Sequence, residues 1–297
     1  MLFSTYGLSK SYGSFMALND LTIDVEEGTV GLLGPNGAGK STLLRILLGL
    51  IETSGGSYEI LGNRKGRVAL DMVGYMPEHD CLPPGLTAVG FVSYFGQLSG
   101  LPPDVAMERT HQTLDYVGLE EERYREIESY STGMKQRVKL AQAIVHDPMV
   151  IFLDEPTNGM DPEGREEMLS LLRGIASIGK SIVLSSHLLP DVEFVCEDAI
   201  IINNGELVEQ GKVKELLGLQ TLRVKIRGDE KGFVNVLREK ECNVSGTGSE
   251  LVVEGDDITH KVWDAALDAN VQIRYMGFRS RSLEELFLDI VEGNNGN

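Results

Sequence analysis

The sequence predicts an α/β fold that carries a helical insertion and is followed by a small α+β unit. Short apolar runs at 29–33, 150–153 and 181–184 have the length and composition of strands that are buried on both faces of a parallel sheet. Between the first two of these runs, at about 82–148, the apolar residues have helical spacing instead. After residue 218 the order of strand and helix patterns changes. A chain of 297 residues is long enough for one large and one small domain.

The first domain is expected over residues 1–218. An alternating strand at 21–25 precedes the strand at 29–33, which runs into a glycine-rich turn and then a helix at 41–48 with leucines on one face. A hairpin is expected at 199–209. It depends on the dipeptide Asn204-Gly205, because this pair suits a turn whose residues have positive φ.

The helical insertion is expected to form a subdomain on the α/β core, because strands precede and follow it. Its first helix is marked by large side chains at helical spacing: Phe91, Tyr94, Phe95 and Leu98. Pro102-Pro103 interrupts this pattern, and a helical pattern resumes at 105–117.

The second domain is expected over residues 219–297. Its patterns follow the order strand, helix, strand, strand, helix, strand and a final helix, at 222–227, 232–240, 243–245, 251–254, 259–270, 271–275 and 283–291. This βαββαβ order indicates a ferredoxin-like split βαβ unit.

Composition limits the environment and the partners of the chain. A net charge of −18 disfavours a nucleic-acid surface and adsorption to anionic lipid, and solubility or a saline or thermophilic source explains it without any functional role. Three scattered cysteines without a C-x-x-C pair fit a reducing compartment. No apolar run approaches the roughly 18 residues of a membrane span, and the N-terminus lacks a signal-peptide core. A cytoplasmic protein that touches the membrane only through a partner is therefore expected.

A phosphate-binding loop is predicted between the strand at 29–33 and the helix that follows. The segment Gly34-Pro35-Asn36-Gly37-Ala38-Gly39-Lys40-Ser41-Thr42 fits the pattern G-x-x-x-x-G-K-[ST] in the structural context that the pattern requires. Glycines allow the backbone N–H groups to surround phosphate oxygens, and the helix N-terminus adds partial positive charge. Lys40 is expected to bind the β- and γ-phosphates, and Ser41 to bind Mg²⁺.

Polar side chains follow two of the buried strands. Asp154 and Glu155 end the strand at 150–153, where ligands of a parallel sheet bind. Asp154 is expected to hold Mg²⁺ through a water, and Glu155 to polarise the attacking water as general base. His187 follows the strand that begins at residue 181 and is a candidate donor to the γ-phosphate, although a lone histidine is more often structural.

At this point the chain resembles the ATP-binding-cassette (ABC) ATPases, from about residue 2 to residue 217. Six motifs occur in the order of that family: the phosphate loop at 34–42, the Q-loop position in Gly74-Tyr75-Met76-Pro77-Glu78, the signature Tyr130-Ser131-Thr132-Gly133-Met134-Lys135-Gln136-Arg137, the pair Asp154-Glu155, the D-loop Asn158-Gly159-Met160-Asp161 and the switch histidine His187. Tyr12 resembles the aromatic residue that stacks on adenine, the alternative being an ordinary strand aromatic. The resemblance implies a P-loop NTPase cassette with a RecA-like parallel core, an antiparallel β part and a helical subdomain.

The resemblance also implies a mechanism. Two cassettes, expected to be identical, hold two ATP molecules between them with Mg²⁺, and Ser131 and Gly133 of one chain cap the γ-phosphate that is bound to the other. Asp161 of the D-loop is expected to contact nucleotide at the same interface. A single chain is then nearly inactive, and Glu155, His187 and Lys40 are the expected catalytic residues.

Several positions depart from the commonest family pattern. Glu78 stands where glutamine is usual; its carboxylate is still expected to contact Mg²⁺, but it should repel the γ-phosphate more than an amide would. Thr132 and Met134 replace glycine and glutamine in the signature. These departures, the D-loop and the segment Ser282-Leu283-Glu284-Glu285-Leu286-Phe287-Leu288 resemble the ABC-2-type exporter ATPases. That narrower resemblance implies a separate membrane permease that docks near the Q-loop and the helical subdomain. The aromatic residues of the first helix there are either part of that surface or, as spacing favours, part of the subdomain core.

Two other functional classes compete with the exporter ATPase. A soluble ABC ATPase that does not transport, such as an assembly or repair factor, shares the same motifs. A DNA-repair ATPase would carry a long coiled-coil or zinc insertion, and a translation factor would carry two cassettes, neither of which the sequence contains. A regulatory module whose C-terminal unit binds a small ligand is a third alternative, which rests on analogy alone; dimer contacts or packing against the cassette are the favoured role of that unit.

Overall fold

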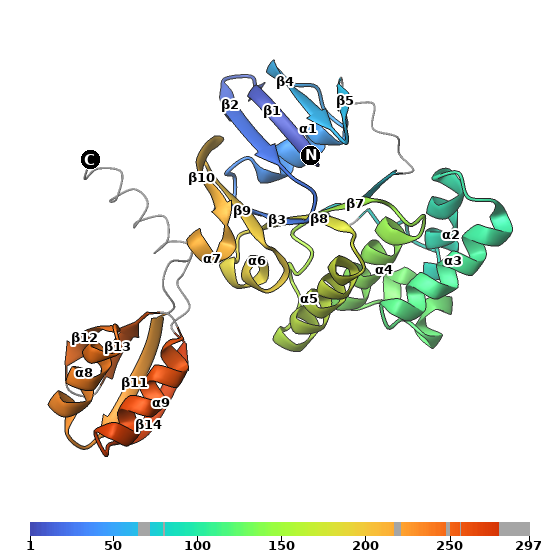
Figure 1. The fold of residues 1–297 in the computed structure, drawn as a ribbon. Coiled ribbons are helices and arrows are strands. Elements are labelled where there is room, and N and C mark those ends of the chain that lie inside the picture. The colour runs from blue at the N-terminus through green and yellow to red at the C-terminus, as the bar shows by residue number, and fades with distance from the viewer. Residues whose placement is uncertain (65–71, 80, 217–220, 248–249, 256, 279–297) are drawn as a thin grey trace. The chain divides into compact units, whose positions relative to one another are not determined.

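The computed structural model describes the chain except for residues 65–71, 80, 217–220, 248–249, 256 and 279–297. It divides into two compact units, Met1–Val213 and Lys214–Asn297 (Figure 1). The expected boundary at 218/219, the helix at 283–291 and the exporter-like segment at 282–288 lie outside the described residues. Within the described part, no helix combines the length and apolar composition that a membrane span requires.

A six-stranded sheet forms the centre of the first unit, in the order β10-β9-β3-β8-β7-β6. Its strands are β3 (Thr29–Leu33), β6 (Val73–Met76), β7 (Val150–Asp154), β8 (Ser181–Ser186), β9 (Asp198–Asn203) and β10 (Glu206–Lys212). All neighbouring strands are parallel except β10, which pairs antiparallel with β9. Every residue of β3, β7 and β8 is buried, as the apolar runs predicted. Asn204 and Gly205, with φ of 49° and 80°, form the predicted turn between β9 and β10.

A second, antiparallel sheet has the order β2-β1-β4-β5 and was only partly predicted. Its strands are β1 (Phe3–Tyr12), β2 (Phe15–Val25), β4 (Gly55–Ile60) and β5 (Asn63–Arg64). Helix α1 (Lys40–Leu47) packs its apolar face into one core with both sheets; Leu43, Leu44 and Leu47 are fully buried there. Helix α1 follows the carboxyl end of β3 after the loop at 34–39.

The helical subdomain lies beside the β6–β7 edge of the large sheet (Figure 1). It contains α2 (Ala88–Leu98), α3 (Pro103–Tyr116), two 3-10 turns (Glu121–Tyr124 and Ile127–Ser129) and α4 (Thr132–Ile144). Thr87 caps α2 by accepting the Gly90 N–H. Phe91 is buried in the subdomain core, whereas Tyr94 is 57% exposed. The core assignment therefore holds for the first of these aromatic residues and not for the second.

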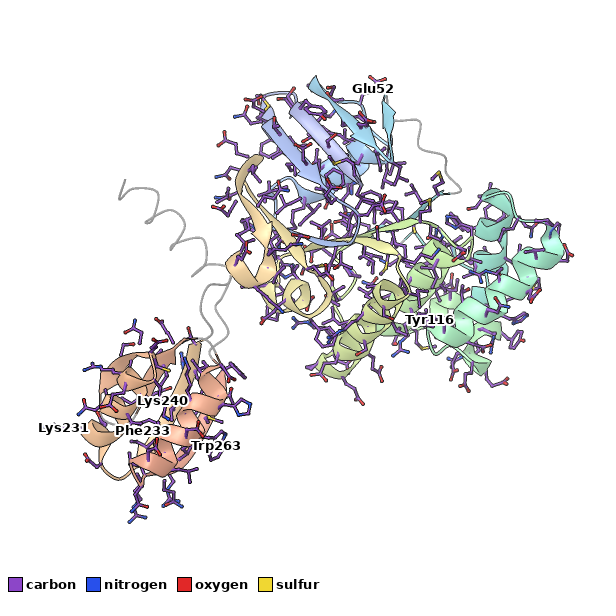
Figure 2. All side chains as sticks on the ribbon, in the orientation of Figure 1. Glu52, Tyr116, Lys231, Phe233, Lys240 and Trp263 are labelled. Carbon is purple, nitrogen blue, oxygen red and sulfur yellow. The ribbon has the colours of Figure 1, made fainter. Side chains whose placement is uncertain are left out.

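Two further helices belong to the first unit, α5 (Pro162–Ser177) and α6 (Leu189–Val195), and the short helix α7 (Val213–Leu216) begins at its last residue and continues into the second unit. The Tyr116 hydroxyl, labelled in Figure 2, donates to the Leu171 carbonyl at 2.6 Å and so joins α3 to α5. At Gly74 a Cβ would lie 2.1 Å from the Ala143 carbonyl oxygen, so β6 and α4 approach too closely for any other residue.

Beyond α7, the described residues of the second unit form a four-stranded antiparallel sheet with two helices. Its elements are β11 (Thr221–Arg227), α8 (Glu230–Glu239), β12 (Asn243–Thr247), β13 (Glu250–Glu254), α9 (Ile258–Asp268) and β14 (Gln272–Phe278). The sheet order β12-β13-β11-β14 places the third strand of the unit between its first and second, which is the ferredoxin-like arrangement. Phe233 is fully buried between helix and sheet, and Trp263 on α9 is 51% exposed (Figure 2).

Candidate functional site

A pocket of about 250 Å³ opens at the carboxyl end of β3. It is lined by residues from the β1–β2 hairpin, the phosphate loop, the segment after β6 and the segment after β7: Tyr12, Phe15, Ala17, Asn36, Gly37, Ala38, Gly39, Lys40, Ser41, Thr42, Glu78 and Glu155. Ligands bind at this end of an open parallel sheet. The structure therefore brings most of the sequence-predicted nucleotide residues into one pocket.

The glycines of the loop are required by the backbone. Gly39 has φ of 108°, and a Cβ at this position would lie 2.6 Å from the Ala17 carbonyl oxygen. At Gly34 a Cβ would lie 2.2 Å from the Ile202 carbonyl oxygen. The loop is therefore held closely between the β1–β2 hairpin region and the end of β9, and only glycine fits these two positions.

Lys40 is 5% exposed and lies in the first turn of α1. Its Nζ donates to the carbonyl oxygens of Gly34 at 2.7 Å and Pro35 at 3.3 Å. The same atom lies 3.4 Å from the Glu155 Oε1. A buried ammonium group at a helix N-terminus, beside a loop of backbone N–H groups, is suited to bind phosphate.

Asp154 lies at the end of β7 and is fully buried. Its Oδ1 accepts a hydrogen bond from the Ser41 hydroxyl at 3.0 Å, while its Oδ2 is a buried oxygen without a hydrogen-bond partner. Burial raises the pKa of this carboxyl group; the Ser41 and Ser185 hydroxyls oppose that rise, and the negative charges of Glu78 and Glu155 add to it.

A divalent cation fits this position. Mg²⁺ is usually bound by one or two protein oxygens together with phosphate oxygens and water, and the free Oδ2 of Asp154 beside the Ser41 hydroxyl offers this donor set. The described residues contain no cluster of three or more His, Cys, Asp or Glu side chains that could hold a metal ion.

Asp154→Asn is expected to raise the melting temperature of the nucleotide-free and Mg²⁺-free protein near about pH 7, by about 2–4 °C for each kcal/mol gained. The pKa of Asp154 is raised above 3.8 in the folded state, so the folded state binds its proton more tightly than the unfolded state does. The stabilisation that the protonated Asp154 gives is complete below pH 3.8 and is lost as the pH rises through the pKa of this group in the folded state. Asparagine carries no charge and avoids that loss.

Melting temperatures of the parent and the variant between about pH 4 and pH 8 check this sign, since the difference between them should grow with pH. Asp24→Asn, on an exposed position of β2, is the matched control. Equal melting temperatures of parent and Asp154→Asn across the range would show that ionisation of Asp154 does not destabilise the folded state.

Glu155 directly follows Asp154 and is 6% exposed. Its φ of 51° is unusual for a residue with a side chain, and its N–H donates to the Ser185 carbonyl at 3.1 Å, across to β8. Its Oε2 lies 2.8 Å from the His187 Nδ1, and its Oε1 faces Lys40. The carboxylate thus lies between His187 and Lys40, which the sequence analysis also predicts to be catalytic.

The signature residues lie at the start of α4. The Ser131 hydroxyl caps this helix by accepting the Met134 N–H at 3.3 Å, and Gly133 occupies the first turn. Neither residue lines the pocket of its own chain, and neither does Asp161, which is the N-cap residue of α5. The Gln136 Nε2 donates to the Asn158 carbonyl at 3.0 Å, so α4 is joined to the loop that contains Asp161.

Sequence reasoning missed Phe15 and Asp191. Phe15 pairs with Tyr12 across the β1–β2 hairpin, so both aromatic rings line the pocket; the short spacing across Gly13 was the available signal. Asp191 is 1% exposed and accepts hydrogen bonds of 2.6 Å from the Thr157 hydroxyl and from the Arg165 Nε. It ties the loop after Glu155 to the helix after His187, and no motif marks it.

Comparisons with known proteins agree with this geometry. A family model described as "ABC transporter" matches residues 18–158. The ABC transporter ATP-binding protein YxlF of Bacillus subtilis, which is uncharacterized, is 34% identical over 98% of this chain and 99% of its own length. Nod factor export ATP-binding protein I of Cupriavidus pinatubonensis is 33% identical over 95% of this chain and 88% of its own.

Solved structures lead to the same family. The dimeric ATP-binding cassette MJ0796, in a post-hydrolysis state bound to ADP and Pi, matches with a TM-score of 0.67 and 25% identity over 72% of this chain and 99% of its own. The phosphate loop, the buried Asp154 and the Glu155–His187 contact thus lie in an ATP-binding cassette fold. The chain belongs to the family of ABC transporter ATP-binding proteins, the ATP-hydrolysing subunits of these transporters.

Proposed function

We propose that this chain powers an ABC-2-type exporter, as one of two identical ATPase subunits that act on a separate membrane permease. The observation that carries its ATPase part is the position of Glu155, which lines the nucleotide pocket and is held between His187 and Lys40. An export function is supported by the Nod factor export relative, which matches 95% of this chain.

The bound nucleotide is ATP, with its base toward Tyr12 and its phosphates toward the loop at 34–42. Lys40 neutralises phosphate charge, and the backbone N–H groups of the loop orient the phosphates. Ser41, Asp154 and Glu78 would hold Mg²⁺, which would neutralise negative charge on the phosphate oxygens when bound. Glu155 takes a proton from water as general base, and His187 orients that carboxylate through its Nδ1.

The remaining parts of the site come from the second subunit. Ser131 and Gly133 lie at the N-terminus of a 13-residue helix, whose partial positive charge suits a phosphate. Because they do not line the pocket of their own chain, they are assigned to the γ-phosphate held by the partner, with Asp161 at the same interface. The dimeric form of the MJ0796 cassette supports this pairing.

The same site would also serve a soluble ABC ATPase without a permease, which remains the competing function. The test is a mild-detergent pull-down of the tagged protein from its native membranes, with partners identified by mass spectrometry. Recovery of a multi-span membrane protein is the expected result. If only soluble partners are recovered and the chain is absent from the membrane fraction, the transport proposal fails while the ATPase assignment stands.

A further inference from the structure

Lys139 is a fully buried lysine in the middle of α4, on the side of that helix that faces the large sheet. Its Nζ donates to the backbone carbonyl oxygens of Pro77 and Glu78, each at 2.9 Å. Burying an amino group is costly unless hydrogen bonds replace its water. A methionine would fill the same space without that cost, so the polar contacts of the lysine explain its presence, and the two carbonyl groups are among them.

The two carbonyl groups belong to the segment that carries Glu78 into the nucleotide pocket. Strand β6 ends at Met76, and Glu78 lines the pocket two residues later. The charge of Glu78 acts on Asp154, the proposed Mg²⁺ ligand. The backbone on either side of Glu78 is therefore held by α4 at the place where the sheet no longer supports it.

Helix α4 also begins at the signature. One end of the helix presents Ser131 and Gly133, and its middle binds two loops, through Gln136 to the Asn158 carbonyl and through Lys139 to the Glu78 segment. The close approach of Gly74 to the Ala143 carbonyl shows that the far end of α4 packs directly on β6. A displacement of α4 would therefore be transmitted to Glu78 by Lys139.

We propose that Lys139 is a positioning residue for the metal site, which holds Glu78 at the nucleotide pocket and joins that carboxylate to the signature helix. The inference rests on the proposed placement of Mg²⁺ at Ser41, Asp154 and Glu78. Lys139 does not touch nucleotide or metal; it acts through the backbone of Glu78.

The test is a cycle of four proteins: parent, Lys139→Met, Glu78→Ala and the double variant. Bound ATP is measured at equilibrium for each protein, at a fixed ATP concentration and increasing Mg²⁺. The readout is the Mg²⁺ concentration that gives half of the Mg²⁺-dependent increase in bound ATP. Lys139→Met is expected to raise that concentration about 10-fold, as loss of an outer-shell partner of a metal site does. ATP affinity in EDTA should stay unchanged.

In the Glu78→Ala background, Lys139→Met is expected to have no further effect, because the side chain that Lys139 positions is gone. Hydrogen exchange at the amides of Glu78 and His79 should be faster in Lys139→Met than in the parent. Lys180→Met is the matched control, since Lys180 is a partly buried lysine directly before β8 whose Nζ donates to the Asp147 carbonyl oxygen and pairs with its carboxylate. It should leave the Mg²⁺ requirement as in the parent.

Three results would overturn the proposal: an unchanged Mg²⁺ requirement in Lys139→Met, an equal effect of Lys139→Met with and without Glu78, or no effect of Glu78→Ala itself. If Lys139→Met does not fold, Lys139→Gln replaces it, since a shorter amide can still donate and should give an intermediate shift. Absence of any Mg²⁺-dependent ATP binding in the parent chain would count against the proposed function instead.

Discussion

Glu155→Gln is expected to lower the ATPase kcat by about 10²- to 10⁴-fold, the usual contribution of a general base. The amide has the same shape, so it should keep the loop geometry, yet it cannot accept a proton from water. ATP binding should be retained, because the phosphate loop and Lys40 are untouched and one negative charge near the phosphates is removed. The variant should therefore accumulate as an ATP-bound dimer, since closure persists without hydrolysis.

Steady-state ATPase assays and size-exclusion chromatography with ATP and Mg²⁺ measure both effects. Glu166→Gln is the matched control, because it makes the same chemical change at an exposed position of α5. The control should hydrolyse ATP at the parent rate and should not accumulate as a dimer. Hydrolysis by Glu155→Gln at the parent rate would show that another group takes the proton.

The core of this site is predictable from sequence because it depends on strand ends. The runs that became β3, β7 and β8 are apolar throughout, so their burial and their polar exits could be assigned, and adjacent parallel strands bring Glu155 and His187 within 2.8 Å. By contrast β1 contains glycine, serine and lysine and has no clear alternation; its pairing with β2 and β4 determines its conformation. Tertiary contacts of this kind override local preference.

Residues that act through the backbone could not be found in the same way. A lysine within a helical pattern is ordinarily read as solvent-facing, and only the fold shows that Lys139 faces the carbonyl groups after β6. The position of Phe15 is similar: its role depends on the hairpin that pairs it with Tyr12. Motifs mark the groups that meet the nucleotide, whereas the groups that hold those motifs in place are marked by contacts that are distant in sequence.

Lys40→Ala should weaken ATP binding about 10- to 150-fold, because hydrogen bonds from a charged donor contribute about 1.5–3 kcal/mol. The buried side chain also faces Glu155, so its removal leaves that carboxylate without its nearby cation and increases repulsion of the γ-phosphate. The loss should therefore persist when binding is measured in EDTA, where Mg²⁺ plays no part.

Lys180→Ala, which removes a lysine at the opposite end of the parallel strands, should bind ATP like the parent. Isothermal titration calorimetry of both variants separates the outcomes: unchanged affinity in Lys40→Ala would remove the phosphate-loop assignment, whereas a loss confined to this variant places the phosphates at the N-terminus of α1.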